Sequence, residues 1–226
     1  MNYRDKIDVF NFNIFKNIEV TGKFNSPIIR PIQIIPKNIV SFNYFNSIKN
    51  TQDYFIHFYI DDYQFERIWN FPNTYTKALK KFAGVIGPDF SAYTDMSISQ
   101  RILNIYRNKL LMAYWQKNGL KVIPNIRWID NCGIKELNNG FDGYPKFSTI
   151  AITTNGIKSI NEITYFTAFC DMLEKLIPTQ IIVIGQLPEE YKKLCKELSI
   201  PIYEYESNLQ ILERKRKEKC YAKSTI

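Results

Sequence analysis

The stretch Phe55-Ile56-His57-Phe58-Tyr59-Ile60 is an unbroken run of apolar and aromatic residues that leads directly into Asp61 and Asp62. Three later stretches repeat this form, with an apolar run that ends in polar residues. They are Gly84-Val85-Ile86 before Gly87-Pro88-Asp89, Val122-Ile123-Pro124 before Asn125, and Thr149-Ile150-Ala151-Ile152 before Thr153-Thr154-Asn155. Short apolar runs predict strands that are covered on both faces, as in a parallel sheet. Because parallel strands end at one edge of their sheet, we expect the polar side chains to gather there and form a site.

Strand and helix patterns alternate along the chain. Apolar residues at helical spacing predict helices over 97–118 and 160–177, and Pro188 opens a third helix. This alternation predicts an α/β fold with a mainly parallel sheet and outer helices. The expected strands favour a small or incomplete (β/α) barrel, with a doubly wound open sheet as the alternative. They lie at 39–43, 54–60, 84–88, 121–126, 149–154, 180–184 and 200–204.

The chain divides into three parts. Residues 1–38 form an irregular N-terminal arm, in which three prolines argue against a central strand. Residues 39–206 form the α/β domain. Residues 207–226 form a basic C-terminal tail, since the last 14 residues carry six Lys or Arg and two Glu. We expect the tail to extend into solvent or to continue the last helix, and it is the part of the chain best suited to a nucleic-acid partner.

The composition is that of an ordinary globular protein, with 45% hydrophobic and 23% charged residues. No apolar run reaches the roughly 18 residues that a membrane span needs, and the N-terminus does not resemble a signal peptide. We therefore expect a cytoplasmic protein with no membrane partner. A single His and four scattered Cys argue against a Cys/His metal site. A carboxylate-bound Mg²⁺ stays open, and the sequence identifies neither a cofactor nor an oligomeric state.

Asp61 and Asp89 are the candidate catalytic residues, because both follow predicted strands. Two carboxylates at neighbouring strand ends can act as an acid/base pair or hold a magnesium ion. Since side chains alternate along a strand, we expect only one of Asp61 and Asp62 to face the site and the other to cap the next helix. The alternative interpretation makes these aspartates caps or turn residues. For Asp89→Asn we expect a stability within about 1 kcal/mol of wild type, together with weaker ligand binding.

Six further residues are candidate ligand-binding residues because of their chemistry and their position. Arg107 is suited to a phosphate or carboxylate, and Tyr93 and Trp128 are suited to stacking on a ring. The alternatives are a solvated or ion-paired Arg107 and an interior Trp128. His57 lies within a predicted strand, so we interpret it as a core residue and expect no Ser–His–Asp triad. The six candidates are Tyr93, Asp95, Arg107, Gln116, Asn125 and Trp128.

Several motifs in the central part of the chain form a recognisable set. They are His57-Phe58-Tyr59-Ile60-Asp61-Asp62-Tyr63-Gln64-Phe65-Glu66, Pro88-Asp89-Phe90-Ser91-x-Tyr93-x-Asp95-Met96, Tyr106-Arg107-Asn108, Tyr114-Trp115-Gln116-x-x-Gly119, Val122-Ile123-Pro124-Asn125-x-x-Trp128 and Phe141-Asp142-Gly143-x-Pro145. This set resembles a family of phages, prophages and bacteria, the domain of unknown function number 4417. Gly87 departs from the serine usual in that family, and 129–139 diverges. The resemblance implies a phage or mobile-element origin and one cytoplasmic α/β domain, with no known activity.

We therefore interpret the chain as a phage-type α/β protein with a pocket at the strand ends for a polar ligand that contains a nucleotide or a phosphate. Two alternatives stay open. The first is a hydrolase or transferase that acts on a nucleotide or glycosidic bond through the paired carboxylates. The second is an accessory factor that binds nucleic acid or protein through its basic tail and its aromatic residues. The sequence does not decide whether the protein is an enzyme.

Overall fold

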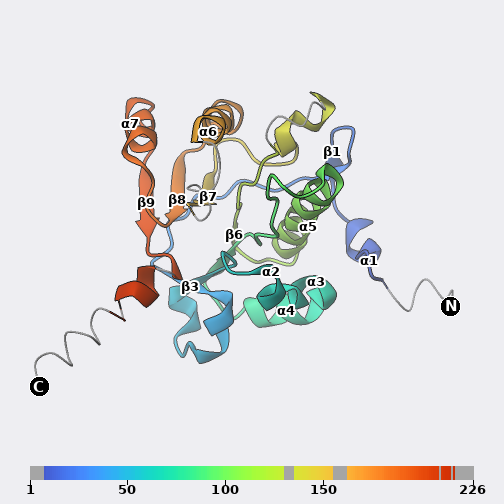
Figure 1. Cartoon of the computed structure of the whole chain (residues 1–226). Helices are drawn as coiled ribbons and strands as arrows, with labels where there is room; N and C mark the ends of the chain where they lie inside the picture. The colour runs from blue at the N-terminus through green and yellow to red at the C-terminus, as the bar shows by residue number, and fades with distance from the viewer. Residues whose placement is uncertain (1–7, 130–134, 155–161, 209, 215, 217–226) are drawn as a thin grey trace, which may run out of the picture.

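The computed structural model describes the chain in five ranges: 8–129, 135–154, 162–208, 210–214 and residue 216 (Figure 1). Within these ranges the domain contains seven parallel strands in two sheets. The first sheet consists of β3 (Asn38–Ser41), β4 (Tyr54–His57), β5 (Gly84–Ile86) and β6 (Val122–Ile123). The second consists of β7 (Thr149–Thr153), β8 (Gln180–Ile184) and β9 (Ile202–Tyr205).

All seven strands follow one another in chain order. Within each sheet, every strand pairs with its neighbour in parallel. A parallel bridge between Asn125 and Ala151 then joins the end of β6 to β7. A doubly wound sheet would reverse its strand order at one point, and this order does not reverse. The expected α/β fold is therefore confirmed, in the strand order of a barrel. In the described ranges no ladder pairs β9 with β3, so the barrel is not closed.

Helices connect most of the strands and cover the outside of the sheets (Figure 1). The longest, α5, begins after the cap Ser97, whose Oγ accepts the Gln100 N–H at 3.3 Å. It ends before Gly119, whose φ of +85° is a left-handed conformation that favours glycine. The helices between strands are α2 (Asp62–Phe65), α3 (Arg67–Asn70), α4 (Pro72–Leu79), α5 (Ile98–Lys117), α6 (Glu162–Leu176) and α7 (Glu189–Glu197). The 3₁₀ segments are η2 (Phe42–Ser47), η3 (Thr51–Asp53) and η4 (Lys135–Gly140).

Two hydrophobic clusters show that the sheets curve. The larger cluster lies between the strands and the outer helices, with Phe58, Trp115 and Phe169 among its fully buried residues. The smaller cluster joins residues from β4 to β8 on the opposite, inner face. Its buried members are Phe55, Tyr59, Ile86, Ile123, Ala151, Ile182 and Ile184. Side chains from so many strands meet on one face only when the sheet wraps around them, as in an incomplete barrel.

The N-terminal arm packs against α5 and beside the start of β7. It contains α1 (Phe12–Phe15) and a two-stranded antiparallel hairpin, β1 (Val20–Thr21) with β2 (Ser26–Pro27). Ile32 then runs beside the start of β7, where its carbonyl accepts the Thr149 N–H at 2.8 Å. Ile32 packs against the inner cluster. The arm therefore packs onto the body.

The first part of the C-terminal tail also differs from a segment that extends into solvent. Ser207 is buried, and 210–214 is helical. At the start of the predicted tail Ser207 therefore packs on the body, while 209, 215 and 217–226 lie outside the described residues. No helix within the described ranges is both long enough and apolar enough to cross a membrane.

Candidate functional site at the carboxyl edge of the first sheet

A cleft of about 630 Å³ lies at the carboxyl ends of β3, β4 and β5. Its volume is in the range of small-molecule sites, and its position is the one that parallel sheets commonly use for ligands. The segment after β9 forms one wall, and in Figure 1 this segment lies next to the one that follows β3. The lining residues include Ser41, Asn43, Tyr44, His57, Tyr59, Asp61, Asp89, Tyr93, Arg127, Glu206, Asn208, Ile211 and Leu212.

A buried ion pair between Asp89 and Arg127 lies in the cleft. Arg127 donates from Nε to one carboxylate oxygen of Asp89 and from Nη2 to the other, which is a bidentate pair. Asn125 donates from Nδ2 to Asp89 Oδ1 at 2.8 Å and accepts the Tyr59 hydroxyl at 2.9 Å. Both oxygens of Asp89 are thus engaged, and a hydrogen-bonded chain runs from Arg127 through Asp89 and Asn125 to Tyr59.

The surrounding structure fixes this network. Asn108 of α5 accepts the Phe90 N–H at 2.9 Å and donates to the Phe90 carbonyl, so the residue after Asp89 is held at both backbone groups. Gly87 follows β5, and an added Cβ there would clash with the sulfur of Met112, so the Met112 side chain of α5 packs closely against this glycine. The loop that carries Asp89 is therefore hydrogen-bonded to α5.

The charges in the network stabilise one another. Burial would lower the pKa of Arg127, but the Asp89 carboxylate outweighs it and raises that pKa above its usual range. Burial, assisted by the Asp89 charge, raises the pKa of Tyr59 well above its ordinary value. Arg127 is therefore a cation and Tyr59 a neutral hydroxyl at physiological pH.

His57 and Ser41 form a second polar group in the cleft. The Nδ1 atom of His57 accepts the backbone N–H of Tyr59 at 3.2 Å. Burial lowers the pKa of His57 to about 3, so the ring is neutral and its proton is on Nε2. Ser41 lies opposite His57 in the register of β3 and β4, and its hydroxyl donates to Asn43 Oδ1 at 2.5 Å.

The two aspartates after β4 have different roles. Asp61 is exposed and lines the cleft, where its Oδ2 accepts Gln64 Nε2 at 3.3 Å. Asp62 instead accepts the backbone N–H of Ser91 at 3.0 Å and the Ser91 hydroxyl at 2.9 Å. Burial raises the pKa of Asp62. One aspartate thus faces the cleft and the other anchors the loop after Asp89. The expected helix cap is wrong, since Asp61 at the cap position makes no side-chain cap hydrogen bond.

The structure separates the six candidate ligand-binding residues. Tyr93 lies at the rim of the cleft with 61% of its surface exposed. Asn125 lies in the network beneath, while Asp95 is exposed and does not line the cleft. Arg107 lies outside the cleft, where it pairs with Glu66 at 2.5 Å.

Gln116 and Arg107 have structural contacts that account for their positions. Gln116 exchanges two hydrogen bonds of 2.8 Å with the backbone N–H and carbonyl of Arg30, so it fastens the N-terminal arm to α5. The guanidinium of Arg107 stacks over the Phe90 ring at 3.7 Å. The structure therefore does not place either residue with Asp61 and Asp89.

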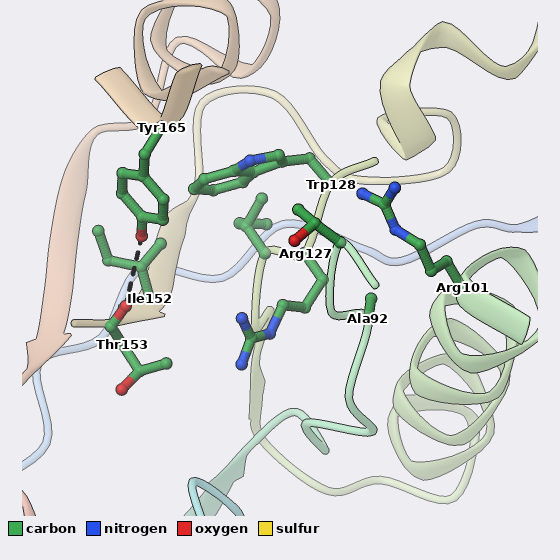
Figure 2. Close-up of a pocket in the computed structure, with 9 residues that line it drawn as sticks. Ala92, Arg101, Arg127, Trp128, Ile152, Thr153 and Tyr165 are labelled. Carbon is green, nitrogen blue, oxygen red and sulfur yellow. Dashed lines mark hydrogen bonds between the residues drawn. The ribbon is translucent and has the colours of Figure 1, made fainter. Parts of the chain in front are cut away.

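Trp128 lines a second, smaller cavity of about 50 Å³. Its ring packs against Tyr165, with centroids 5.1 Å apart, and the Tyr165 hydroxyl donates to the Thr153 carbonyl at 3.4 Å (Figure 2). Arg101 and Arg127 also line this cavity, but Figure 2 shows their guanidinium groups pointing in different directions. The cavity thus does not direct two arginines at one anion.

Sequence reasoning missed several residues of the cleft, among them Arg127, Ser41 and His57. Arg127 could have been predicted from the sequence, because side chains alternate along an extended chain and Arg127 lies two residues after Asn125. Ser41 and His57 end strands in the same way. His57 is buried, as expected from the sequence, and it also lines the cleft. In the part of the chain that the structure describes, no three His, Cys, Asp or Glu side chains lie close enough together to hold a metal ion.

Comparison with known proteins identifies relatives in phages. The chain is 28% identical to the "Gene 1 protein" of Mycobacterium phage L5 over 209 residues, which covers 87% of this chain and 83% of that protein. It is 26% identical to the "Gene 1 protein" of Mycobacterium phage D29 over 227 residues, which covers 94% of this chain and 76% of that protein. No solved structure matches the chain significantly. Residues 18–206, most of the chain, match one family, which confirms the resemblance seen in the motifs. The chain belongs to the phage-associated family Domain of unknown function (DUF4417).

Proposed function

We propose that this phage-type protein binds a nucleoside, or the nucleoside part of a nucleotide, in the carboxyl-edge cleft. The observation that carries the proposal is the combination, in one cleft of about 630 Å³, of aromatic side chains and buried polar groups with fixed hydrogen-bonding directions. Tyr44 and Tyr93 offer ring faces, and His57 and Ser41 offer polar atoms. A planar heterocycle uses both kinds of contact, since it stacks on aromatic rings and hydrogen-bonds through its edge.

The charges of the cleft favour the nucleoside over a free phosphate. The acidic lining residues are Asp61, Asp89 and Glu206, and the basic one is Arg127, which Asp89 already neutralises. Among the described lining residues, a phosphate would meet the carboxylate of Asp61 and no cation that is free of an ion pair. Sugar hydroxyls, by contrast, donate readily to a carboxylate such as the exposed Asp61. The phosphate of a bound nucleotide would therefore point toward solvent.

The hydrogen bonds of the cleft support binding more than catalysis. A Ser–His nucleophile needs a histidine nitrogen that accepts the serine proton. In His57 the Nδ1 lone pair accepts the Tyr59 N–H, and Nε2 carries the proton, so the ring cannot act as that base for Ser41. Asp89 accepts three donors from Arg127 and Asn125, which leaves it poorly placed as an acid or a base. The hydrolase or transferase alternative therefore has less support.

The accessory-factor alternative depends mainly on the basic tail. Arg214 is ion-paired with Glu206 at 3.1 Å. The lysines and the cysteine from 217 onward lie outside the described residues. No observation on the described residues favours nucleic-acid binding over nucleoside binding in the cleft.

Calorimetric titration with four nucleosides tests the proposal. We would titrate uridine, cytidine, inosine and adenosine into wild type, into Tyr93→Ala and into the matched control Tyr63→Ala. Both tyrosines are exposed, at 61% and 79%, but Tyr63 does not line the cleft. Loss of a stacking ring costs about 1–3 kcal/mol, so Tyr93→Ala should weaken binding about tenfold while Tyr63→Ala leaves it unchanged. The proposal fails if none of the four binds, or if both variants lose affinity equally.

A further inference from the structure

The ends of β3 and β4 bring two almost completely buried polar side chains to the cleft. Ser41 and His57 are register partners on adjacent parallel strands, so their side chains project from the same face. They are 2% and 3% exposed, yet both line the cleft. Asn43, two residues beyond Ser41, lines the same wall. Buried polar atoms that border a cavity are positioned to bind a ligand, because leaving them unpaired is costly.

The hydrogen bonds of this wall define which atoms donate and which accept. His57 accepts the Tyr59 N–H on Nδ1, so its Nε2–H is a donor, and among the described residues it has no protein acceptor. Ser41 uses its proton on Asn43 Oδ1, so its Oγ offers lone pairs to the cleft. With Oδ1 occupied in this way, the Nδ2 group of Asn43 is a second donor. The wall therefore presents a donor, an acceptor and a donor.

We propose that His57, Ser41 and Asn43 recognise the imide edge of a pyrimidine such as uracil or thymine. This inference rests on the proposed nucleoside function. The imide edge presents a carbonyl, an N–H and a second carbonyl, which is the complement of the wall. One carbonyl accepts from His57 Nε2–H, the N3–H donates to Ser41 Oγ, and the other carbonyl accepts from Asn43 Nδ2.

The wall discriminates because the competing bases present the wrong pattern. Cytosine has an amino donor and a ring-nitrogen acceptor where uracil has a carbonyl and an N–H. It would therefore place a donor against His57 Nε2–H and an acceptor against Ser41 Oγ. A site that is built to hydrogen-bond one edge rejects an analogue with mismatched groups, since its own buried groups are left unpaired. Neutral His57 cannot adapt by changing its charge near pH 7, because burial lowers its pKa to about 3.

Calorimetric titration with uridine, cytidine and 3-methyluridine tests the inference on the full chain. The methyl group of 3-methyluridine removes only the N3–H donor. We expect uridine to bind wild type at least tenfold more tightly than either of the other two, which corresponds to about 1.4 kcal/mol. In Ser41→Ala the acceptor is gone, so the preference for uridine over 3-methyluridine should fall to within about threefold. Ser99→Ala, an exposed change on α5, should keep the wild-type preference.

The outcomes separate the inference from the function on which it rests. Equal binding of uridine and cytidine, with affinity that still depends on Tyr93, would overturn the inference and leave nucleoside binding intact. A preference for uridine that Ser41→Ala does not reduce would also overturn it. If none of uridine, cytidine, inosine and adenosine binds wild type, both the inference and the proposed function fail. The comparison of ligands on wild type tests the inference even if the Ser41→Ala variant does not fold.

Discussion

Replacing Asp89 with asparagine tests the buried ion pair in the cleft. Asp89 is 6% exposed, and its two oxygens hold the Nε and Nη2 groups of Arg127. Removing one partner of a buried pair costs about 3–5 kcal/mol, because the other charge is left uncompensated. The Arg127 side chain keeps 27% exposure, so water compensates part of this loss. We therefore expect Asp89→Asn to destabilise the fold by about 2–3 kcal/mol, in place of the change within about 1 kcal/mol that the sequence alone suggested.

Chemical denaturation followed by circular dichroism measures this loss. For a chain of this size, each kcal/mol corresponds to roughly 2–4 °C in the melting temperature, so a scan should show a fall of about 4–12 °C. Asp95→Asn is the matched control, since Asp95 is exposed and its loss should cost less than about 0.5 kcal/mol. Adding Arg127→Met to Asp89→Asn should recover part of the loss, since it removes the uncompensated cation. If Asp89→Asn is as stable as Asp95→Asn, the ion pair is not structural and our reasoning is refuted.

Three further predictions follow from other contacts. His57 is the only histidine, and burial lowers its pKa to about 3 from an unfolded value near 6.5, so its contribution to stability is present above pH 6.5 and is lost as the pH falls toward 3. As the pH falls through this window, the free energy of unfolding of wild type should therefore decrease by up to about 1.4 kcal/mol per pH unit more than that of His57→Gln. Denaturation experiments in which the two proteins lose stability in parallel would contradict a lowered pKa of His57. Gln116→Ala removes two hydrogen bonds to the arm and should lower the free energy of unfolding by about 1–2 kcal/mol without changing the affinity for uridine. A loss of uridine affinity at unchanged stability would instead show that Gln116 contributes to the binding site. Deleting 213–226 removes the exposed ion pair between Arg214 and Glu206, and exposed pairs contribute little to stability. The melting temperature should therefore change by less than about 2 °C, and a large drop would show that this segment packs on the body.

The strands of the fold were predictable because burial on both faces leaves a simple local pattern. Each expected strand is present, although β4 ends at His57 and the apolar residues Phe58 to Ile60 continue beyond the ladder. Helix α4 was not predicted, since Pro72, Asn73 and Thr74 open it with weak helix formers. The curvature of the sheets could not be predicted from the sequence either, because it depends on contacts among strands that are distant in the sequence.

The site was predictable only in part, for a similar reason. Position at a strand end led to Asp61, Asp89 and Asn125, because parallel strands share one carboxyl edge. The same logic fails for Arg107, since spacing along a helix does not determine which side of α5 meets the cleft. Arg107 stacks on Phe90 outside it. The ion pair with Arg127 also required knowledge of which strand ends are neighbours.

A crystal structure of the protein grown with saturating uridine shows directly whether the carboxyl-edge cleft binds the nucleoside. We predict uridine density in the carboxyl-edge cleft, with the ring against Tyr93 and the imide edge on Ser41 and His57. The Asp89–Arg127 pair should remain in place beneath it. Uridine bound only at another surface, such as the small cavity beside Trp128, or an empty cleft under these conditions, would contradict nucleoside binding in the cleft.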